Sequence, residues 1–104
     1  MFRLAFVVAL AVSAVGGAPP NIVIHQKGRV FSAQSLTVAR GQPVVFLNDD
    51  TVPHNVISTN DENGFDLGLE MPGNAVPVSF TMAGVVVVMC AIHPRMHMTI
   101  TVGN

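Results

Sequence analysis

The sequence "VVVVMCAIHPRMHMTITV" (residues 85–102) predicts two β-strands joined by a tight loop. Residues 85–89 are apolar at every position, which indicates a central strand covered on both faces. Residues 98–102 alternate apolar side chains with threonines, which is typical of a strand with one buried face. Residues 90–98 span the loop and reach the second strand. They hold the only cysteine, two of the four histidines and two of the six methionines of the chain.

Short apolar runs with turn signals between them extend this pattern along the chain. Strand character appears in five further segments, residues 22–24, 36–39, 44–47, 54–58 and 76–82. Turn residues such as Arg40-Gly41-Gln42-Pro43 and Ala83-Gly84 separate them. About seven short strands with such turns predict an all-β fold, an antiparallel sandwich or barrel. Residues 60–74 are rich in Gly, Asn and Asp, and we expect a loop or one short helix there.

The first 18 residues have the layout of a secretory signal peptide. Arg3 supplies a positive charge, an apolar run follows in residues 4–15, and small residues come next. This run is too short to span a bilayer comfortably. We therefore expect cleavage near residues 17/18 and export of a single domain, residues 19–104. An apolar N-terminal strand or an uncleaved anchor is the alternative.

The composition narrows the class of partner and raises a question about the thiol. Five Lys and Arg balance six Asp and Glu, and Tyr and Trp are absent, so we expect no nucleic-acid partner.

Small exported domains often rely on disulfides, but one cysteine cannot form a disulfide within the chain. The thiol must then serve a partner chain, a reaction or a metal.

The spacing of soft and imidazole side chains favours a metal. His93 follows Cys90 after two residues, and Met96 follows His93 after two more. A second imidazole must come from elsewhere, and His54 is well placed because it lies after a turn at the start of a strand. Two His, one Cys thiolate and a weak axial Met form the ligand set of a blue-copper electron-transfer site. We therefore predict one copper ion bound by His54, Cys90, His93 and Met96, with Met98 as the alternative axial ligand.

The residue after the first predicted histidine is a candidate for tuning this site. We expect the backbone amide of Asn55 to donate a hydrogen bond to the Cys90 sulfur, because such bonds tune the redox potential. Its side chain is expected to tie the two ligand loops together.

Two segments resemble the cupredoxin family, the small blue copper proteins that include plastocyanin, pseudoazurin and amicyanin. The stretch "VVFLNDDTVPHNVIS" (residues 44–58) is similar to the family's strand with its first His ligand. The stretch "AGVVVVMCAIHPRM" (residues 83–96) resembles the Cys-x-x-His-x-x-Met loop in its short, amicyanin-like form. This resemblance implies an eight-stranded Greek-key sandwich with one type 1 copper, in which His54, Cys90 and His93 take the equatorial positions.

The resemblance also implies a function, with one alternative. It implies a monomeric periplasmic protein, not an enzyme, that carries single electrons between redox proteins. These partners would dock transiently near His93, on an apolar patch of Ile92, Pro94, Met71 and Pro53. The alternative is a periplasmic copper carrier or resistance protein without a redox role, suggested by the neighbouring His97 and Met98.

Overall fold

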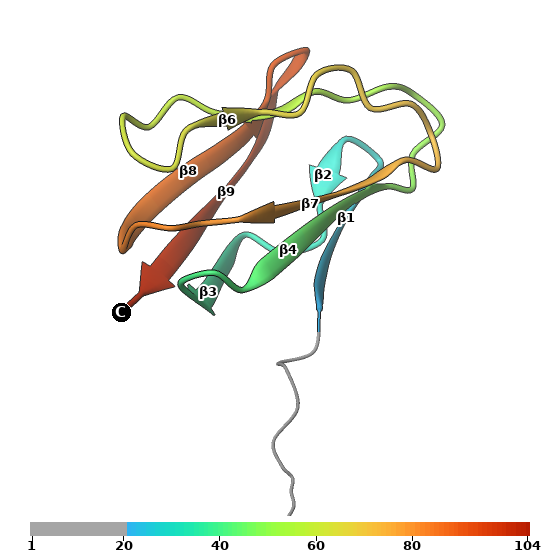
Figure 1. Cartoon of the computed structure of the whole chain (residues 1–104). Coiled ribbons are helices and arrows are strands. Elements are labelled where there is room, and N and C mark those ends of the chain that lie inside the picture. Colours follow the sequence, from blue (N-terminus) through green and yellow to red (C-terminus); the bar gives the residue numbers. More distant parts are fainter. Residues whose placement is uncertain (1–20) are drawn as a thin grey trace, which may run out of the picture.

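Two β-sheets packed face to face form the fold (Figure 1). The computed structural model describes residues 21–104, so the predicted signal peptide, residues 1–18, lies outside the described part. The strands are β1 (Ile22–Lys27), β2 (Val30–Phe31), β3 (Ser35–Ala39), β4 (Pro43–Asn48), β5 (Val56–Ser58), β6 (Phe65–Asp66), β7 (Ala75–Ser79), β8 (Gly84–Cys90) and β9 (His93–Gly103). One sheet has the order β2-β1-β4-β7, and the other has the order β3-β9-β8-β5-β6.

The predicted all-β sandwich is confirmed, but its sheets are mixed rather than purely antiparallel. β1 pairs with β4 in parallel, and β3 pairs with β9 in parallel. The chain passes from β1 through β3 in the opposite sheet before it returns to β4, and such a crossover allows the parallel direction. Side-chain alternation cannot reveal this direction, because it is the same in parallel and antiparallel strands.

The prediction that residues 85–89 are covered on both faces was wrong. Val86 and Val88 are fully buried, whereas Val85 is 55% exposed and Val87 is 52% exposed. β8 is central within its sheet, but the sheet is an outer layer of the sandwich and only its inner face is covered. The continuous apolar run therefore reflects the strand propensity of valine as well as burial.

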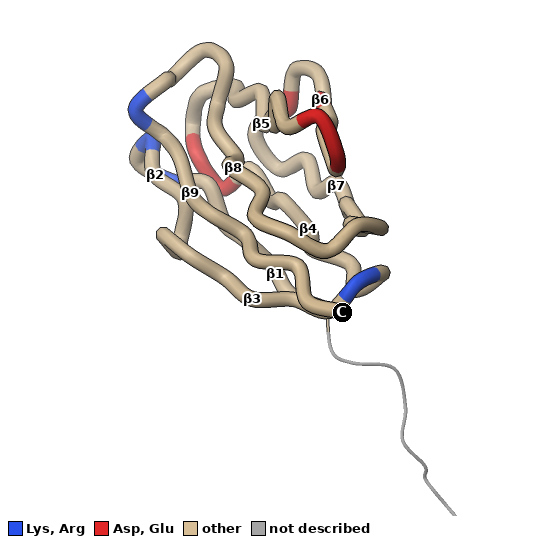
Figure 2. The backbone as a smooth tube through the Cα atoms, turned by 90° about the vertical axis from the view of Figure 1, so that its left-hand side faces the viewer, with Lys and Arg blue, Asp and Glu red and all other residues tan. Residues whose placement is uncertain are grey.

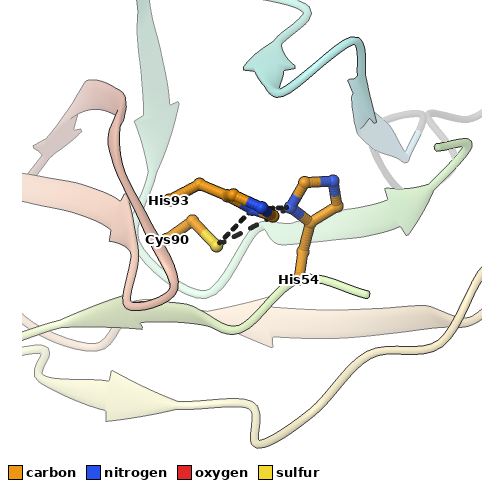
Figure 3. A group of neighbouring side chains, drawn as sticks. All are labelled: His54, Cys90 and His93. Carbon is orange, nitrogen blue, oxygen red and sulfur yellow. Dashed lines mark hydrogen bonds between the residues drawn. The ribbon is translucent and has the colours of Figure 1, made fainter. Parts of the chain in front are cut away.

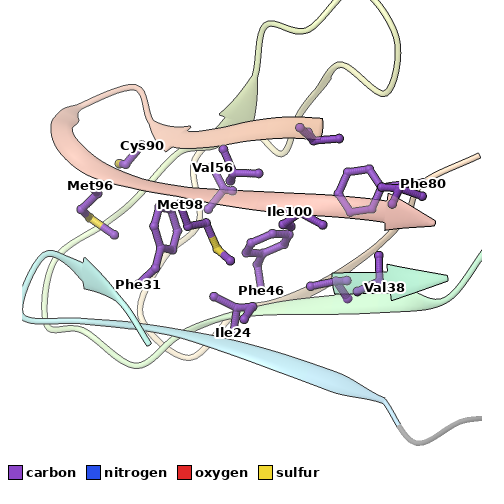
Figure 4. Close-up of a cluster of buried hydrophobic side chains, with 14 residues drawn as sticks. Ile24, Phe31, Val38, Phe46, Val56, Phe80, Cys90, Met96, Met98 and Ile100 are labelled. Atoms are coloured by element: carbon purple, nitrogen blue, oxygen red, sulfur yellow. The ribbon is translucent and has the colours of Figure 1, made fainter. Parts of the chain in front are cut away.

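The core between the sheets reaches the pole at which the predicted ligands lie. Four phenylalanines form a chain of ring contacts through it: Phe31 to Phe46, Phe46 to Phe65, and Phe65 to Phe80, with ring centroids 5.9 to 6.3 Å apart. Figure 4 shows Cys90 and Met96 at one end of this buried cluster. The predicted site is thus built on apolar packing that shields it from water on its inner side.

Residues 60–74 form a loop with one short strand, β6, and no helix. Asn60, which precedes β6, binds the edge of β8 with its side chain: its Nδ2 donates to Val85 O and its Oδ1 accepts from Val87 N. No helix within residues 21–104 is long and apolar enough to cross a membrane.

Candidate metal centre

Three of the four predicted ligands meet at one pole of the sandwich (Figure 3). Cys90 is the last residue of β8 and His93 is the first residue of β9, so a turn of two residues brings them together. His54 comes from the other predicted segment and lies just before β5, which pairs with β8. This pairing of β5 with β8 carries His54 to the Cys90 end of the sheet.

The three donor atoms form a nearly equilateral triangle. The Cys90 sulfur lies 3.6 Å from His54 Nδ1 and 3.7 Å from His93 Nδ1, and the two nitrogens are 3.1 Å apart. A point equidistant from all three lies about 2.0 Å from each, close to the metal–nitrogen and metal–sulfur distances of zinc sites. One thiolate with two imidazoles suits copper in both its oxidation states, so the residues fit a copper ion.

The ligand turn, residues 90–96, interrupts the ladder between β8 and β9. Cys90 is paired with His93, but the preceding residue, Met89, is already paired with His97. Three residues of β9, Pro94 to Met96, therefore bulge out of the ladder. Such a bulge re-aims side chains at the end of a sheet, and here it does so beside Cys90.

The same register separates the two candidate axial ligands. Met96 and Met98 are both 1% exposed and point to the inner face of β9. Met98 lies opposite Val88, which is two residues, or about 7 Å, further from the pole than Cys90. Figure 4 likewise shows Met96 at the Cys90 end of the core and Met98 towards Phe46 and Ile100. This placement favours Met96, and the four residues remain a predicted ligand set.

His54 is held on both sides by groups that fix its orientation. The residue is fully buried, and its backbone N–H and C=O both bond to the backbone of Glu70, at 3.0 and 2.7 Å. On its ring, Nε2 lies 3.0 Å from the Asp50 carboxylate. A carboxylate on Nε2 keeps the proton there, which leaves the lone pair of Nδ1 directed at Cys90 and His93.

Asp50 joins His54 to a distant hairpin turn. Its Oδ2 accepts both from His54 Nε2 and, at 2.9 Å, from the backbone N–H of Arg29, in the turn between β1 and β2. The backbone bond from Arg29, followed by the bonds from His54 and Thr51, holds the pKa of Asp50 well below its usual range. The carboxylate therefore stays charged wherever the protein is folded near neutral pH.

Asn55 makes one of its two expected contacts. Its backbone N–H lies 3.3 Å from the Cys90 sulfur, as predicted. Its side chain does not link the ligand segments, because Nδ2 donates to Asp66 at 2.7 Å instead. The link is made by the backbone, since Ala91 N–H donates to Asn55 O at 2.9 Å.

Behind His54 lies a set of polar residues whose burial the sequence did not reveal. The His54 cluster consists of the buried Gln26, Asn48, His54 and Glu70 together with the partly buried Asp50. Gln26 Nε2 donates to Glu70 Oε1, and Asn48 Nδ2 donates to Glu70 O, both at 2.9 Å. Glu70 is 1% exposed; burial raises the pKa of its carboxyl, while the Gln26 bond and the charge of His54 oppose the rise. Glu70 lies in a loop, where acidic residues are normally solvated, so its sequence context gives no sign of burial.

His93 is the accessible edge of the site. It lines an open hollow of about 380 Å³ together with Arg29, Ile92, Pro94, Arg95 and Met96. Met71 and Pro53, which we expected in this patch, do not line the hollow. Burial of the ring lowers the pKa of His93, and the neighbouring His54 ring and Arg29 guanidinium lower it further, while the Asp50 carboxylate opposes them.

The other two histidines lie outside the site. His25 bonds to Asp49 on the surface, and His97 is exposed on the outer face of β9. Both side chains are exposed.

Comparison with known proteins gives one family and a set of similar structures. Residues 20–103 match the family described as copper binding proteins of the plastocyanin/azurin family. A comparison with curated protein sequences gives no significant match.

The similar structures share the fold at 24% sequence identity. A Cu-containing nitrite reductase from Thermus scotoductus SA-01 has a TM-score of 0.77; the match covers 91% of this chain but only 25% of the reductase chain. A purple cupredoxin from Nitrosopumilus maritimus has a TM-score of 0.70 and is matched over 79% of this chain and 99% of its own. For amicyanin from Paracoccus versutus the TM-score is 0.72, with 79% and 80% covered.

Proposed function

The chain belongs to the copper-binding plastocyanin/azurin family, and on that premise we propose that it carries single electrons between redox proteins through a type 1 copper site. The observation that carries this proposal is the triangle of one sulfur and two Nδ1 atoms. The proposed axial ligand, Met96, is buried at the same end of the core as Cys90. Copper bound there supplies one-electron chemistry by alternating between its two oxidation states.

In this proposal the protein has two tasks, which fall to different residues. His54 and Cys90 are fully buried and hydrogen-bonded, so they keep the donor atoms in place when the charge of the site changes. His93 has an accessible edge and gives electrons a short route to a partner. A site fixed in this way needs little rearrangement for electron transfer.

We further propose that the chain is not an enzyme. Four protein side chains would surround the ion, and the sulfur and His54 are shielded from solvent, so no position is left for a substrate. The nitrite reductase shares the fold over a quarter of its own length, and its activity is not carried to this chain by that likeness.

The remaining proposals concern location and partners. Residues 1–18 would direct export to the periplasm, where residues 19–104 would act as a monomer. Partners would bind transiently at His93, since redox encounters use small interfaces.

The two residues that suggested the copper-carrier alternative do not extend the predicted site. That alternative relied on His97 and Met98 as additional ligands next to Met96. His97 lies on the outer face of β9 and Met98 lies within the core, so neither extends the predicted site towards solvent.

The test is the visible spectrum of the purified protein after one equivalent of Cu(II). We expect an intense blue thiolate-to-copper band that is absent in Cys90→Ser. Met82→Leu, an exposed methionine remote from the predicted ligands in sequence, serves as the matched control and should keep the band. Copper binding without such a band would refute the electron-transfer proposal and support copper handling.

A further inference from the structure

Two arginines from distant parts of the chain flank His93. Arg29 lies in the turn between β1 and β2, and Arg95 lies in the bulge of the ligand turn, yet both line the same hollow as His93. Figure 2 shows basic segments beside β2 and at the bend leading into β9, with another basic segment near the C-terminus. The hollow at His93 is thus lined by two positive side chains and by no acidic one, although the whole chain has a net charge of −1.

The charges of these arginines are not neutralised within the described chain. In residues 21–104 the ion pairs are His25 with Asp49 and His54 with Asp50, and no Lys or Arg takes part in one. The acidic residues next to the pole are thus engaged elsewhere: Asp49 by His25, and Asp50 by His54 and the backbone of Arg29. Both guanidinium groups remain available to an external carboxylate.

The backbone of Arg29 is a second, independent observation. Gly28 and Arg29 have φ values of 64° and 59°, the left-handed pair of a two-residue hairpin turn. The second position of such a turn favours Gly or Asn, and a long side chain there costs conformational energy. Strain of this kind at the edge of a functional site points to a use for the side chain beyond the turn.

The turn is also fixed relative to the predicted copper ligand. The Asp50 oxygen that accepts from Arg29 N–H accepts from His54 Nε2 as well. Arg29 is therefore held at a defined place beside the site rather than on a free loop. Arg95 lies in a bulge whose two ends are held by ladder pairs, His93 with Cys90 and His97 with Met89.

Between the arginines the surface is apolar. We define the His93 surface as Arg29, Ile92, His93, Pro94 and Arg95. Ile92 is 48% exposed and Pro94 completes an apolar centre next to the ring of His93. A small apolar centre flanked by charges of one sign favours a weak complex with a partner of the opposite sign, which the charges steer into place.

We propose that the His93 surface docks a redox protein whose exposed centre is surrounded by carboxylates. This inference rests on the proposed electron-transfer function and adds the chemistry of the partner. Arg29 and Arg95 pair with the partner's carboxylates, and Ile92 and Pro94 exclude water from the contact.

The first test uses two small oxidants of opposite charge on the reduced, copper-loaded protein. Hexacyanoferrate(III) takes one electron and becomes hexacyanoferrate(II), and tris(phenanthroline)cobalt(III) takes one electron and becomes the cobalt(II) complex. In the double variant Arg29→Gln/Arg95→Gln we expect oxidation by the anionic reagent to slow roughly tenfold at low ionic strength, and the difference to shrink at high salt. Oxidation by the cationic reagent should stay equal or become faster.

The control is Arg40→Gln, which removes one positive charge between β3 and β4. Arg40 follows Ala39, which pairs with Gly103 at the end of β9 remote from His93. It should follow the parent with both reagents. Arg29→Gly with Arg95→Gln removes the same two charges while favouring the turn, so it keeps the test valid if Arg29→Gln folds poorly. The blue band should match the parent in every variant. Loss of the two positive charges lowers the reduction potential and so favours oxidation by both reagents, whereas steering changes the two rates in opposite directions; the potential of each variant is therefore measured alongside.

A second measurement locates the contact on the protein surface. Amide shifts of the reduced protein are followed while an acidic ferredoxin, or a basic c-type cytochrome as the control, is added. We expect shifts at residues 28–29 and 92–95 with the ferredoxin only, and their loss in the double variant.

The results separate the docking inference from the proposed function. If the parent shows no blue band and reacts with neither oxidant, the proposed function fails. If the parent reacts with both oxidants but the arginine variants match Arg40→Gln, only the docking inference is overturned. Shifts centred on the outer face of β8, around Val85 and Val87, would also overturn it.

Discussion

The two halves of the predicted site are built in opposite ways. The His54 cluster is buried and assembled from segments far apart in sequence, with His54 bonded to Glu70 and Asp50. The ligand turn, residues 90–96, is local, and its His93 borders an open hollow. Backbone bonds of Asn55 to Cys90 and Ala91 join the two halves. The comparison indicates that the cluster fixes the donor geometry and the turn provides access.

The largest difference should appear when each histidine is removed from the metal-free protein. His54→Ala leaves a cavity and takes a hydrogen-bond partner from the buried side of Asp50, so it should lower the free energy of unfolding by about 3 kcal/mol. His93→Ala removes an accessible ring and should cost less than about 1 kcal/mol. Urea unfolding of both variants measures the difference. Equal losses of unfolding free energy would mean that the buried and the accessible half of the site contribute equally to stability.

The next effect concerns the charge within the His54 cluster. Asp50→Asn should lower the free energy of unfolding by about 1–2 kcal/mol, because it weakens the bonds to His54 and Arg29. Since the folded-state pKa of Asp50 lies below its unfolded value, its contribution is fully present above the unfolded pKa. That contribution is lost as pH falls through the folded-state pKa.

Metal-free Asp50→Asn should therefore lose less stability between pH 6 and pH 3 than the parent does. Asp61→Asn is a control at an exposed carboxylate in the loop between β5 and β6. In the copper-loaded protein Asp50→Asn should also raise the reduction potential, because a nearby negative charge that stabilises Cu(II) is removed. An unchanged reduction potential would show that the Asp50 carboxylate does not influence the copper site.

Glu70 should show the opposite pH dependence. Its folded-state pKa is raised, so the folded protein binds this proton more tightly than the unfolded chain. The stabilisation is complete below the unfolded pKa and is lost as pH rises through the folded-state pKa. Glu70→Gln should therefore be more stable than the parent at pH 8 and should show no advantage at pH 4. A variant that is destabilised equally at both pH values would show that the carboxyl's own contacts dominate.

The smallest expected effect on stability is that of replacing either core methionine, and the two replacements should differ in their effect on the copper site. Met96→Leu and Met98→Leu conserve volume, so each should change the free energy of unfolding by less than about 1.5 kcal/mol. Only Met96→Leu should raise the reduction potential and alter the blue spectrum, because it removes the weak axial sulfur. If Met98→Leu gave the spectral change instead, the axial assignment would move to Met98.

Local patterns predicted much of the fold and the site. The alternation in residues 98–102 gave a strand with the correct inner face, and the alternation in residues 76–82 did so up to Phe80, whereas β7 ends at Ser79 and Met82 is exposed. The Cys90–His93–Met96 spacing gave a turn that brings donors together. His54 was predictable because it starts a strand segment after a turn. These features depend on neighbours in sequence, where side-chain type and backbone preference act directly.

Features that depend on distant contacts were not predictable. The outer face of β8 is exposed because the sheet has no second layer over it, which the valine run does not encode. Glu70 became buried because its loop packs against Gln26 and Asn48. Arg29 reached the site through a hairpin turn that Asp50 holds, and neither residue carries a local signal for that contact.

The parallel pairing of β3 with β9 has a consequence for the order of assembly. The partner strand of β3 begins more than fifty residues later in the sequence. This sheet therefore cannot form completely until nearly the whole domain has been synthesised. Three of the four predicted ligands lie in the same late segment, and a copper ion meeting the growing chain would find only His54. The complete predicted ligand set therefore exists only once this segment has been synthesised, and the buried polar contacts around His54 would keep the folded, metal-free protein ready to receive its ion.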